Sequence, residues 1–352
     1  MVVEHELGRY GTRRARPAER LRDLVRNPYF PIWPATALLF LVSPLIAPGS
    51  MATSALSSTI PFAAILAIAS VGQTLVIQQR GLDLSVPGMI SLATIIVTKY
   101  PDGQNSGLAS ALALVVGAAV ATGIVNGFAV TRLRVTPLIA TLAVNALLLG
   151  VILQITGGSS TATPAPALVS LAFEKTGGIP NTVLIAAGVI AVVSVVMRRT
   201  AVGRRFVIVG TSAPAAYVAG IPVRAYVWGT YVAAALFYAL AAVLLAGYVG
   251  TPGLSAGNNY LLPSITAVVL GGASLAGGAG SVVGTAMGAV FLIQLQQDVF
   301  GAGAPTSVQY LIQAGVIGTA MALRNLHLGA DLRNALSRAR GRGQLPASGT
   351  AT

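Results

Sequence analysis

The chain has 352 residues, of which 55% are hydrophobic and only 9% are charged, and its formal net charge is +13. Apolar runs recur along nearly the whole length, so one water-soluble core cannot bury them, and the composition predicts an integral membrane protein. Cysteine is absent, which excludes disulfides, thiol catalysis and thiolate metal sites. His5 and His327 lie in polar tails without an acidic cluster, so we expect no metal site and no cofactor.

Ten apolar runs are candidate membrane spans, because a helix needs about 20 mostly apolar residues to cross the hydrocarbon core. The runs are too long for barrel strands and lack period-two alternation, so the expected fold is all-α. In chain order they are Ile32 to Ala47, Leu56 to Gln78, Val86 to Thr98, Leu108 to Val130, Pro137 to Thr156, Thr182 to Met197, Tyr226 to Tyr248, Leu261 to Ala276, Val282 to Gln297 and Val308 to Leu323.

The basic residues predict the orientation, because Lys and Arg near span ends stay preferentially in the cytoplasm. With the amino terminus inside, ten spans place 20 of the 22 basic residues on the cytoplasmic side, and only Lys99 and Lys175 fall outside. The positive charge therefore indicates topology and contact with membrane lipid, not nucleic acid. We expect a basic cytoplasmic tail at 1–30, a transmembrane domain at 31–325 and a cytoplasmic tail at 326–352.

Ten spans divide into two halves of five, and the longest basic loop, 198–225, lies within the second half. Because each half has an odd number of spans, the two halves cross the membrane in opposite orientations, as the halves of an inverted repeat do. The two halves have no convincing sequence identity, so this repeat is predicted from the count of spans alone.

The stretch GQTLVIQQRGLDLSVPG, residues 72–88, places Arg80 and Asp83 inside an apolar chain. The third run begins just after it and covers only about 20 Å of the roughly 30 Å of hydrocarbon, which predicts a short, broken third helix. Asp83 or Ser85 could cap that helix, and Pro87 suits its first turn. In one interpretation Asp83 is only a cap and Arg80 only an interfacial anchor; in the other the break lines a cavity, because irregular backbone in a membrane needs protein or water partners.

Uncharged polar residues within the spans could exchange hydrogen bonds with a polyhydroxylated solute, although bonds between helices explain them equally well. Together with the residues of the break they form the candidate substrate pathway: Gln73, Asp83, Ser85, Asn126, Asn145, Gln154, Thr266 and Gln294.

The same stretch closely resembles the G-x-T-x-V-I…G-I-D-L-S-V-G signature of the membrane-spanning permeases of bacterial ABC importers for monosaccharides, of the ribose, xylose and galactose type. The resemblance continues through NGFAVTRLRVTPLIATLAVNALLLG (126–150), TAVGRRFVIVGTSAPAAYVAGIPV (200–223) and LLPSITAVVLGGASLAGGAGSVVGTAMGA (261–289), and it covers roughly 61–323. It implies a type II ABC importer-like fold in the bacterial cytoplasmic membrane. It also implies three kinds of partner: a second permease subunit, identical or paralogous; two cytoplasmic ABC ATPase subunits or one fused ATPase; and an extracytoplasmic sugar-binding protein.

In this family a cytoplasmic helix of the 200–223 segment docks into the ATPase, and the resemblance implies the same role here for Arg204, Arg205, Ala215, Ala216 and Gly220. The small residues Ala216 and Gly220 lie one helical turn apart, which allows another backbone to come close. The family commonly has Glu before two alanines, whereas this chain has proline there, which puts a charge contact in doubt. The plainer interpretation is a solvated basic loop.

The glycine-rich segment 271–289 lacks the Lys-Ser/Thr ending of a phosphate loop, and no Gly-Lys pair occurs in the chain. We therefore expect no ATP hydrolysis by this chain, and no enzyme. Gly280, Gly284 and Gly288 recur every four residues, which predicts a groove for close helix packing.

Two other classes of protein remain possible from composition. A secondary, ion-coupled transporter would ordinarily carry acidic groups within its spans, and Asp83 and Asp298, both near span ends, are the only candidates. An intramembrane enzyme would need a nucleophile, a base or a metal cluster, and the sequence contains no such arrangement.

Overall fold

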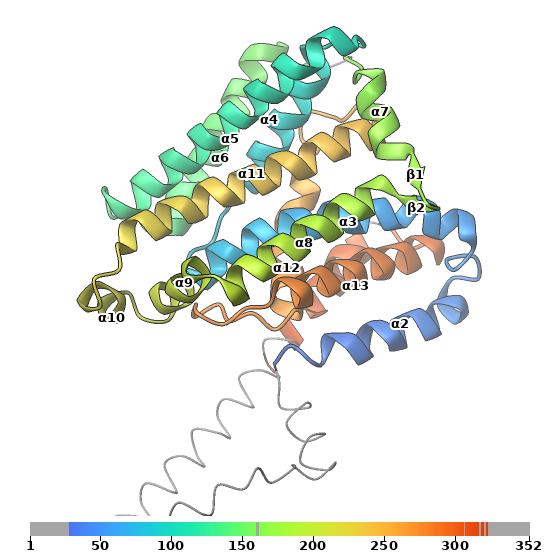
Figure 1. Cartoon of the computed structure of the whole chain (residues 1–352). Helices are drawn as coiled ribbons and strands as arrows, with labels where there is room; N and C mark the ends of the chain where they lie inside the picture. The colour runs from blue at the N-terminus through green and yellow to red at the C-terminus, as the bar shows by residue number, and fades with distance from the viewer. Residues whose placement is uncertain (1–27, 160–161, 306, 317, 320–321, 323–352) are drawn as a thin grey trace, which may run out of the picture.

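The computed structural model describes residues 28–322 except 160–161, 306, 317 and 320–321, and most of this part is helical (Figure 1). The predicted tails at 1–30 and 326–352 lie outside the described residues, apart from 28–30.

The first five predicted spans all form helices, with ends within three residues of those expected. Proline stands in the first turn of both α4 and α6, where its missing N–H needs no partner. The helices are α2 (Ile32–Ile46), α3 (Thr53–Gln78), α4 (Val86–Lys99), α5 (Leu108–Thr131, preceded by the 3-10 turn η1, Asn105–Gly107) and α6 (Pro137–Thr156).

The chain then crosses to the second set of helices through two elements that the sequence did not indicate: α7 (Pro166–Phe173) and a two-stranded antiparallel hairpin, in which β1 (Lys175–Thr176) pairs with β2 (Ile179–Pro180). The second set follows as α8 (Asn181–Arg199), α9 (Ala201–Thr211), α10 (Ala213–Val218), α11 (Val223–Val249), α12 (Asn258–Leu270) and α13 (Val282–Gly301), and residues 307–316 are also helical.

The eighth predicted span is too long, because α12 stops at Leu270 and not at Ala276. Gly272 has a φ of +83°, a left-handed conformation that glycine adopts without steric cost. The chain turns there and reaches α13 through an irregular glycine-rich segment.

Six of the described helices are long and apolar enough to cross a membrane: α3, α5 together with η1, α6, α8, α11 and α13. The apolar helices α2 and α4 have only 15 and 14 residues. Length therefore supports six of the ten predicted spans, and the broken third helix is short as expected.

The centre of the molecule is formed by α3 and α11 (Figure 1). The apolar window of α3 is 89% buried and that of α8 only 11%, so α3 is a core helix and α8 an outer helix whose apolar face suits lipid. Each central helix contacts helices from the other half of the chain: α3 packs against α12 and α13, and α11 packs against α4 and α5.

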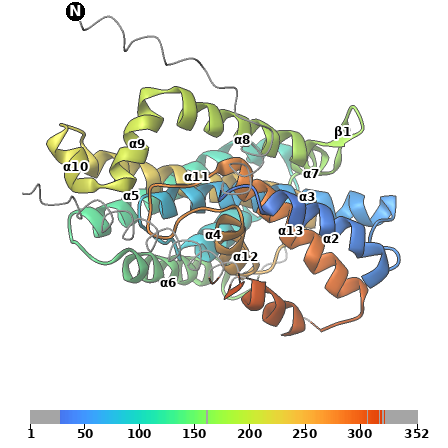
Figure 2. The same ribbon diagram turned by 90° about the horizontal axis from the view of Figure 1, so that it is seen from below.

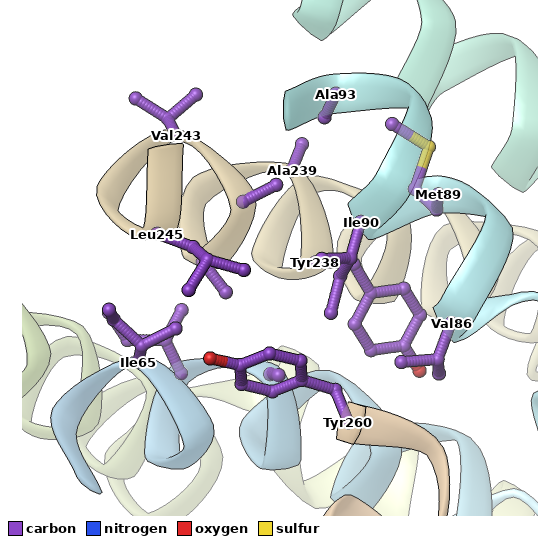
Figure 3. Close-up of a cluster of buried hydrophobic side chains, with 14 of the residues drawn as sticks. Ile65, Val86, Met89, Ile90, Ala93, Tyr238, Ala239, Val243, Leu245 and Tyr260 are labelled. Atoms are coloured by element: carbon purple, nitrogen blue, oxygen red, sulfur yellow. The ribbon is translucent and has the colours of Figure 1, made fainter. Parts of the chain in front are cut away.

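Aromatic side chains fill the space between these helices. Tyr238 of α11 points toward the start of α4, where Val86 and Ile90 lie, and Tyr260 of α12 points toward Ile65 of α3 (Figure 3). The short helices α9 and α10 lie at one end of the bundle, and α7 with the hairpin lies at the other (Figures 1 and 2).

Candidate functional site

The candidate site is built around the break between α3 and α4. At its end, α3 forms a Schellman motif, in which Gly81 N–H donates to the Val76 carbonyl at 3.0 Å and Arg80 N–H donates to the Ile77 carbonyl at 2.9 Å. Arg80 occupies the left-handed position of this motif with a φ of 63°, where glycine is usual. An arginine there costs roughly 1 to 2 kcal/mol in backbone energy, so its side chain must make contacts that offset this cost.

Asp83 organises the buried side of the break. Its Oδ1 accepts hydrogen bonds from the Ser85 backbone N–H at 2.9 Å and the Ser85 hydroxyl at 2.5 Å. The Ser85 hydroxyl oxygen in turn accepts from Asn126 Nδ2 of α5 at 2.9 Å. Asp83 is only 1% exposed, and its Oδ2 has no hydrogen-bond partner among the described residues.

This geometry changes the predicted cap. Ser85 is the N-cap residue of α4, but its side chain makes no capping bond, and Asp83 holds the backbone N–H of Ser85 itself. The carboxylate therefore fixes the entry into α4 and does not close its first turn.

Two backbone donors of the break are satisfied by side chains of α6. Leu84 N–H donates to Thr141 Oγ1 at 2.9 Å, and Gly88 N–H donates to Asn145 Oδ1 at 2.8 Å. Irregular backbone at this depth is thus paired with protein, as a membrane interior requires.

The other predicted pathway residues are divided. Gln73 is buried in α3, where its Oε1 accepts from the Tyr238 hydroxyl at 2.9 Å and its Nε2 has no partner among the described residues. Thr266 bonds only back to its own helix, at the Leu262 carbonyl, and Gln154 is exposed on α6. The structure therefore brings Asp83, Ser85 and Asn126 together, with Asn145 on the same break. Gln73 is linked to this cluster through Tyr238, whose hydroxyl also lies beside Asp83, whereas Gln154, Thr266 and Gln294 lie elsewhere.

Gln294 belongs to a second buried polar cluster, which joins α2 to α13. Its Nε2 donates to Asp298 Oδ1 at 2.9 Å and to Ser43 Oγ at 3.2 Å, while the Ser43 hydroxyl donates to Asp298 Oδ2 at 2.6 Å. One oxygen of this buried carboxylate bonds α2 directly, and the other bonds Gln294 of the same helix, which also contacts Ser43.

Arg80 connects the break to α9. Its Nε donates to the Gly210 carbonyl at 3.0 Å, and its Nη2 donates to the Thr211 carbonyl. Next to it, Gln79 Nε2 donates to the Phe206 carbonyl at 2.8 Å. The last carbonyls of a helix lack partners and carry partial negative charge, so a guanidinium is well suited to bind them. Arg80 is therefore a C-terminal cap of α9.

The contact between α3 and α9 is close. A Cβ on Gly210 would lie 2.1 Å from the Gln78 carbonyl oxygen, which is far inside contact distance, so only glycine permits this approach. The end of α9, the end of α3 and the break thus form one bonded unit.

Of the predicted small-residue face of the α9–α10 segment only Ala216 points inward, and Gly220 lies beyond the end of α10 at Val218. Ala216 is fully buried against Val209 and Ile221, whereas Arg204, Arg205, Ala215 and Gly220 are exposed. The outermost side chains of α10 are Tyr217 and Val218, which are 78% and 87% exposed. The sequence analysis missed this exposed pair, although two adjacent large apolar residues in a basic loop were a usable signal.

The model of the family described as "Branched-chain amino acid transport system / permease component" matches residues 55–321. The chain belongs to this permease family. The predicted resemblance to ABC importer permeases is thereby confirmed.

Curated relatives agree with this assignment. The probable ABC transporter permease protein y4mJ of Sinorhizobium fredii is 32% identical over 267 residues, which cover 75% of this chain and 79% of that protein. The autoinducer 2 import system permease proteins LsrD of Photorhabdus laumondii and of Escherichia coli strain K12 are 32% and 31% identical over 270 residues. These matches cover 75% of this chain and 80% and 81% of the two relatives. No solved structure matches the chain.

In this permease the predicted packing glycines lie against neighbouring segments. A Cβ on Gly284 would lie 2.5 Å from the Gly271 carbonyl oxygen, and one on Gly288 would lie 2.4 Å from that of Ala267. Gly280 precedes α13, which begins at Val282 after the Ser281 cap, and so lies off the predicted helix face. It packs instead against the side chain of Gln78 in α3.

Proposed function

We propose that the chain is the membrane-spanning subunit of an ATP-driven importer for a sugar or sugar-like solute. It would act with a second permease subunit, identical or paralogous, with two ABC ATPase subunits or one fused ATPase in the cytoplasm, and with an extracytoplasmic binding protein. ATP hydrolysis would occur on the ATPase, and this chain would carry none. The family membership and the autoinducer 2 import permeases among its relatives support this proposal.

The packing supports an arrangement of two inverted halves. The first half would comprise α2 to α6, and the second α8, α11, α12, α13 and the helix at 307–316. The second helix of each half is the longest, with 26 residues in α3 and 27 in α11, and the third is short, with 14 in α4 and 13 in α12. Because α3 packs on the third and fourth helices of the other half, and α11 does the same in return, the contacts repeat as a pseudo-two-fold axis requires.

We further propose that α9 and α10 transmit movements of the ATPase to the break between α3 and α4. The single observation that carries this proposal is the hydrogen bonding of Arg80, at the break, to the end of α9. An ATPase that contacts the exposed end of α10 would displace α9, and the displaced carbonyls would pull on the junction of α3 and α4. Asp83 follows Arg80 by only three residues. A movement of α9 at the cytoplasmic face would therefore reach the buried cluster of Asp83, Ser85 and Asn126 directly.

Val218→Asp should weaken binding of the ATPase subunit by at least about tenfold, because it places a charge where an apolar side chain would be buried in the contact. Copurification of the ATPase with the tagged permease from membranes measures this. Val218→Thr keeps the shape of the side chain and should retain most of the binding.

Equal ATPase recovery with Val218→Asp and the unsubstituted chain would remove α10 from the contact. Recovery of the permease from the membrane fraction should be the same for both variants, because the side chain is 87% exposed and supports no internal packing.

The proposed topology places both termini and the α9–α10 segment in the cytoplasm. In this cysteine-free chain, Thr163→Cys should be labelled from outside intact cells by an impermeant maleimide, whereas Ala201→Cys should be labelled only after the cells are opened. Both positions are exposed. The opposite pattern of labelling would contradict the orientation.

A further inference from the structure

A cavity of about 590 Å³ lies at the end of the bundle away from α9 and α10. Its walls come from the first turns of α3, the ends of α11 and α13, the start of α12 and the helix at 307–316. None of the eight candidate pathway residues lines it. Its volume is within the range of about 300 to 1,000 Å³ that is typical of small-molecule sites.

The wall of this cavity is polar but uncharged. Among the described residues that line it are no Asp, Glu, Lys, Arg or His, while five carboxamides face it together with hydroxyl and aromatic side chains. The carboxamides are Asn259, Gln296, Gln297, Gln309 and Gln313. Of the five, Gln313 is buried, Gln296, Gln297 and Gln309 are partly buried and Asn259 is exposed, so a solute in the cavity could reach their donors and acceptors.

One of these amides is buried without its partner. Gln313 is only 3% exposed, and its Oε1 has no hydrogen-bond partner among the described residues. A buried unpaired carbonyl oxygen costs roughly as much as a lost hydrogen bond, and it is a site that a donor group of a ligand could satisfy. Tyr260 of α12, which is 7% exposed, contributes an aromatic ring to the same cavity.

We propose that this cavity binds a neutral, polyhydroxylated solute of monosaccharide size. Sugar hydroxyls both donate and accept, so they match carboxamides, which do the same, and the apolar face of a sugar ring packs against aromatic rings such as those of Phe62 and Tyr260. A zwitterionic amino acid would leave its ammonium group without an anionic partner on this wall, which is costly away from water. The inference rests on the proposed function and names the substrate class and the residues that would contact it.

The test uses the absence of cysteine from the chain. Gln297→Cys places one thiol in the cavity wall, and Gln104→Cys places a control thiol on the exposed segment between α4 and η1, outside the cavity. The permease with its ATPase is placed in lipid nanodiscs free of sugar detergents. The rate of maleimide labelling is then measured with D-ribose, D-xylose or D-galactose, and with L-leucine.

At least one of the three sugars should slow labelling of Gln297→Cys by about threefold or more, with no effect of leucine and no effect on Gln104→Cys. In the Gln297→Cys background, Gln313→Leu and, separately, Gln296→Leu should remove this protection, while Gln104→Leu, at an exposed glutamine outside the cavity, should preserve it. Protection by leucine alone, or no protection by any of the sugars, would overturn the proposal. Labelling requires neither ATP nor transport, so this failure is distinguishable from failure of ATPase binding or of ATP-driven uptake.

Discussion

Asp83→Ala is expected to abolish ATP-driven solute uptake while the permease still reaches the membrane and still binds its ATPase. The substitution removes the acceptor for two donors, the backbone N–H and the hydroxyl of Ser85, at a position that is 1% exposed. Two unpaired donors cost about 1 to 3 kcal/mol each, which is enough to displace the entry into α4 and the bond from Asn126 to Ser85. Uptake into proteoliposomes, normalised to the amount of inserted protein, measures the effect.

Asp83→Asn tests which property of the side chain matters. Its amide oxygen can still accept from Ser85, so it should retain part of the uptake if hydrogen bonding is the role of Asp83. Equal loss in Asp83→Asn and Asp83→Ala would show that the negative charge is required. Full activity of both variants would remove the cluster from the transport mechanism.

Arg80→Ala is expected to uncouple ATP hydrolysis from transport. The variant loses both guanidinium bonds to the carbonyls of Gly210 and Thr211, so α9 can move without moving the junction of α3 and α4. Charge-assisted hydrogen bonds contribute about 1.5 to 3 kcal/mol each, so we expect solute uptake per ATP hydrolysed to fall by at least about tenfold while ATPase binding is retained. Arg80→Lys keeps the charge but can reach only one carbonyl at a time. Its solute uptake per ATP hydrolysed should therefore lie between that of Arg80→Ala and that of the unsubstituted chain.

Gly210→Ala probes the same contact without changing a charge. Its Cβ would lie 2.1 Å from the Gln78 carbonyl oxygen and force α9 away from α3, so it should uncouple as Arg80→Ala does. Gly229→Ala is the matched control, because it lies at a helical position with nothing within 4 Å of the added Cβ. It should leave the ratio of solute uptake to ATP hydrolysis unchanged. A normal ratio of uptake to hydrolysis in both Arg80→Ala and Gly210→Ala would exclude this route of coupling.

The long helices could be predicted from the sequence because hydrocarbon imposes a length and a composition on each span. The run at 137–156 was predicted to the residue, and the short third helix followed from its length. The end of α12 was missed because the window at 261–276 remains apolar through the glycine turn. Hydropathy counts side chains and does not register a left-handed glycine.

The candidate site was predicted only in part, because its residues meet through contacts between distant segments. Asp83 and Ser85 are neighbours in sequence, and their hydrogen bond follows from that spacing. The partners of Arg80 lie about 130 residues further along the chain and are backbone carbonyls, which have no residue signature. The amide-lined cavity was missed for a similar reason, since Asn259, Gln297 and Gln313 come from three separate helices.

The most direct test of the proposed function is uptake of radiolabelled D-ribose, D-xylose and D-galactose into proteoliposomes that contain the permease with its copurified ATPase and binding protein. Uptake of at least one sugar should require ATP on the side of the ATPase, should stop when the ATPase is omitted, and should persist when sodium and proton gradients are collapsed. Uptake that proceeds without ATPase and stops when an ion gradient is collapsed would contradict the account and indicate a secondary transporter.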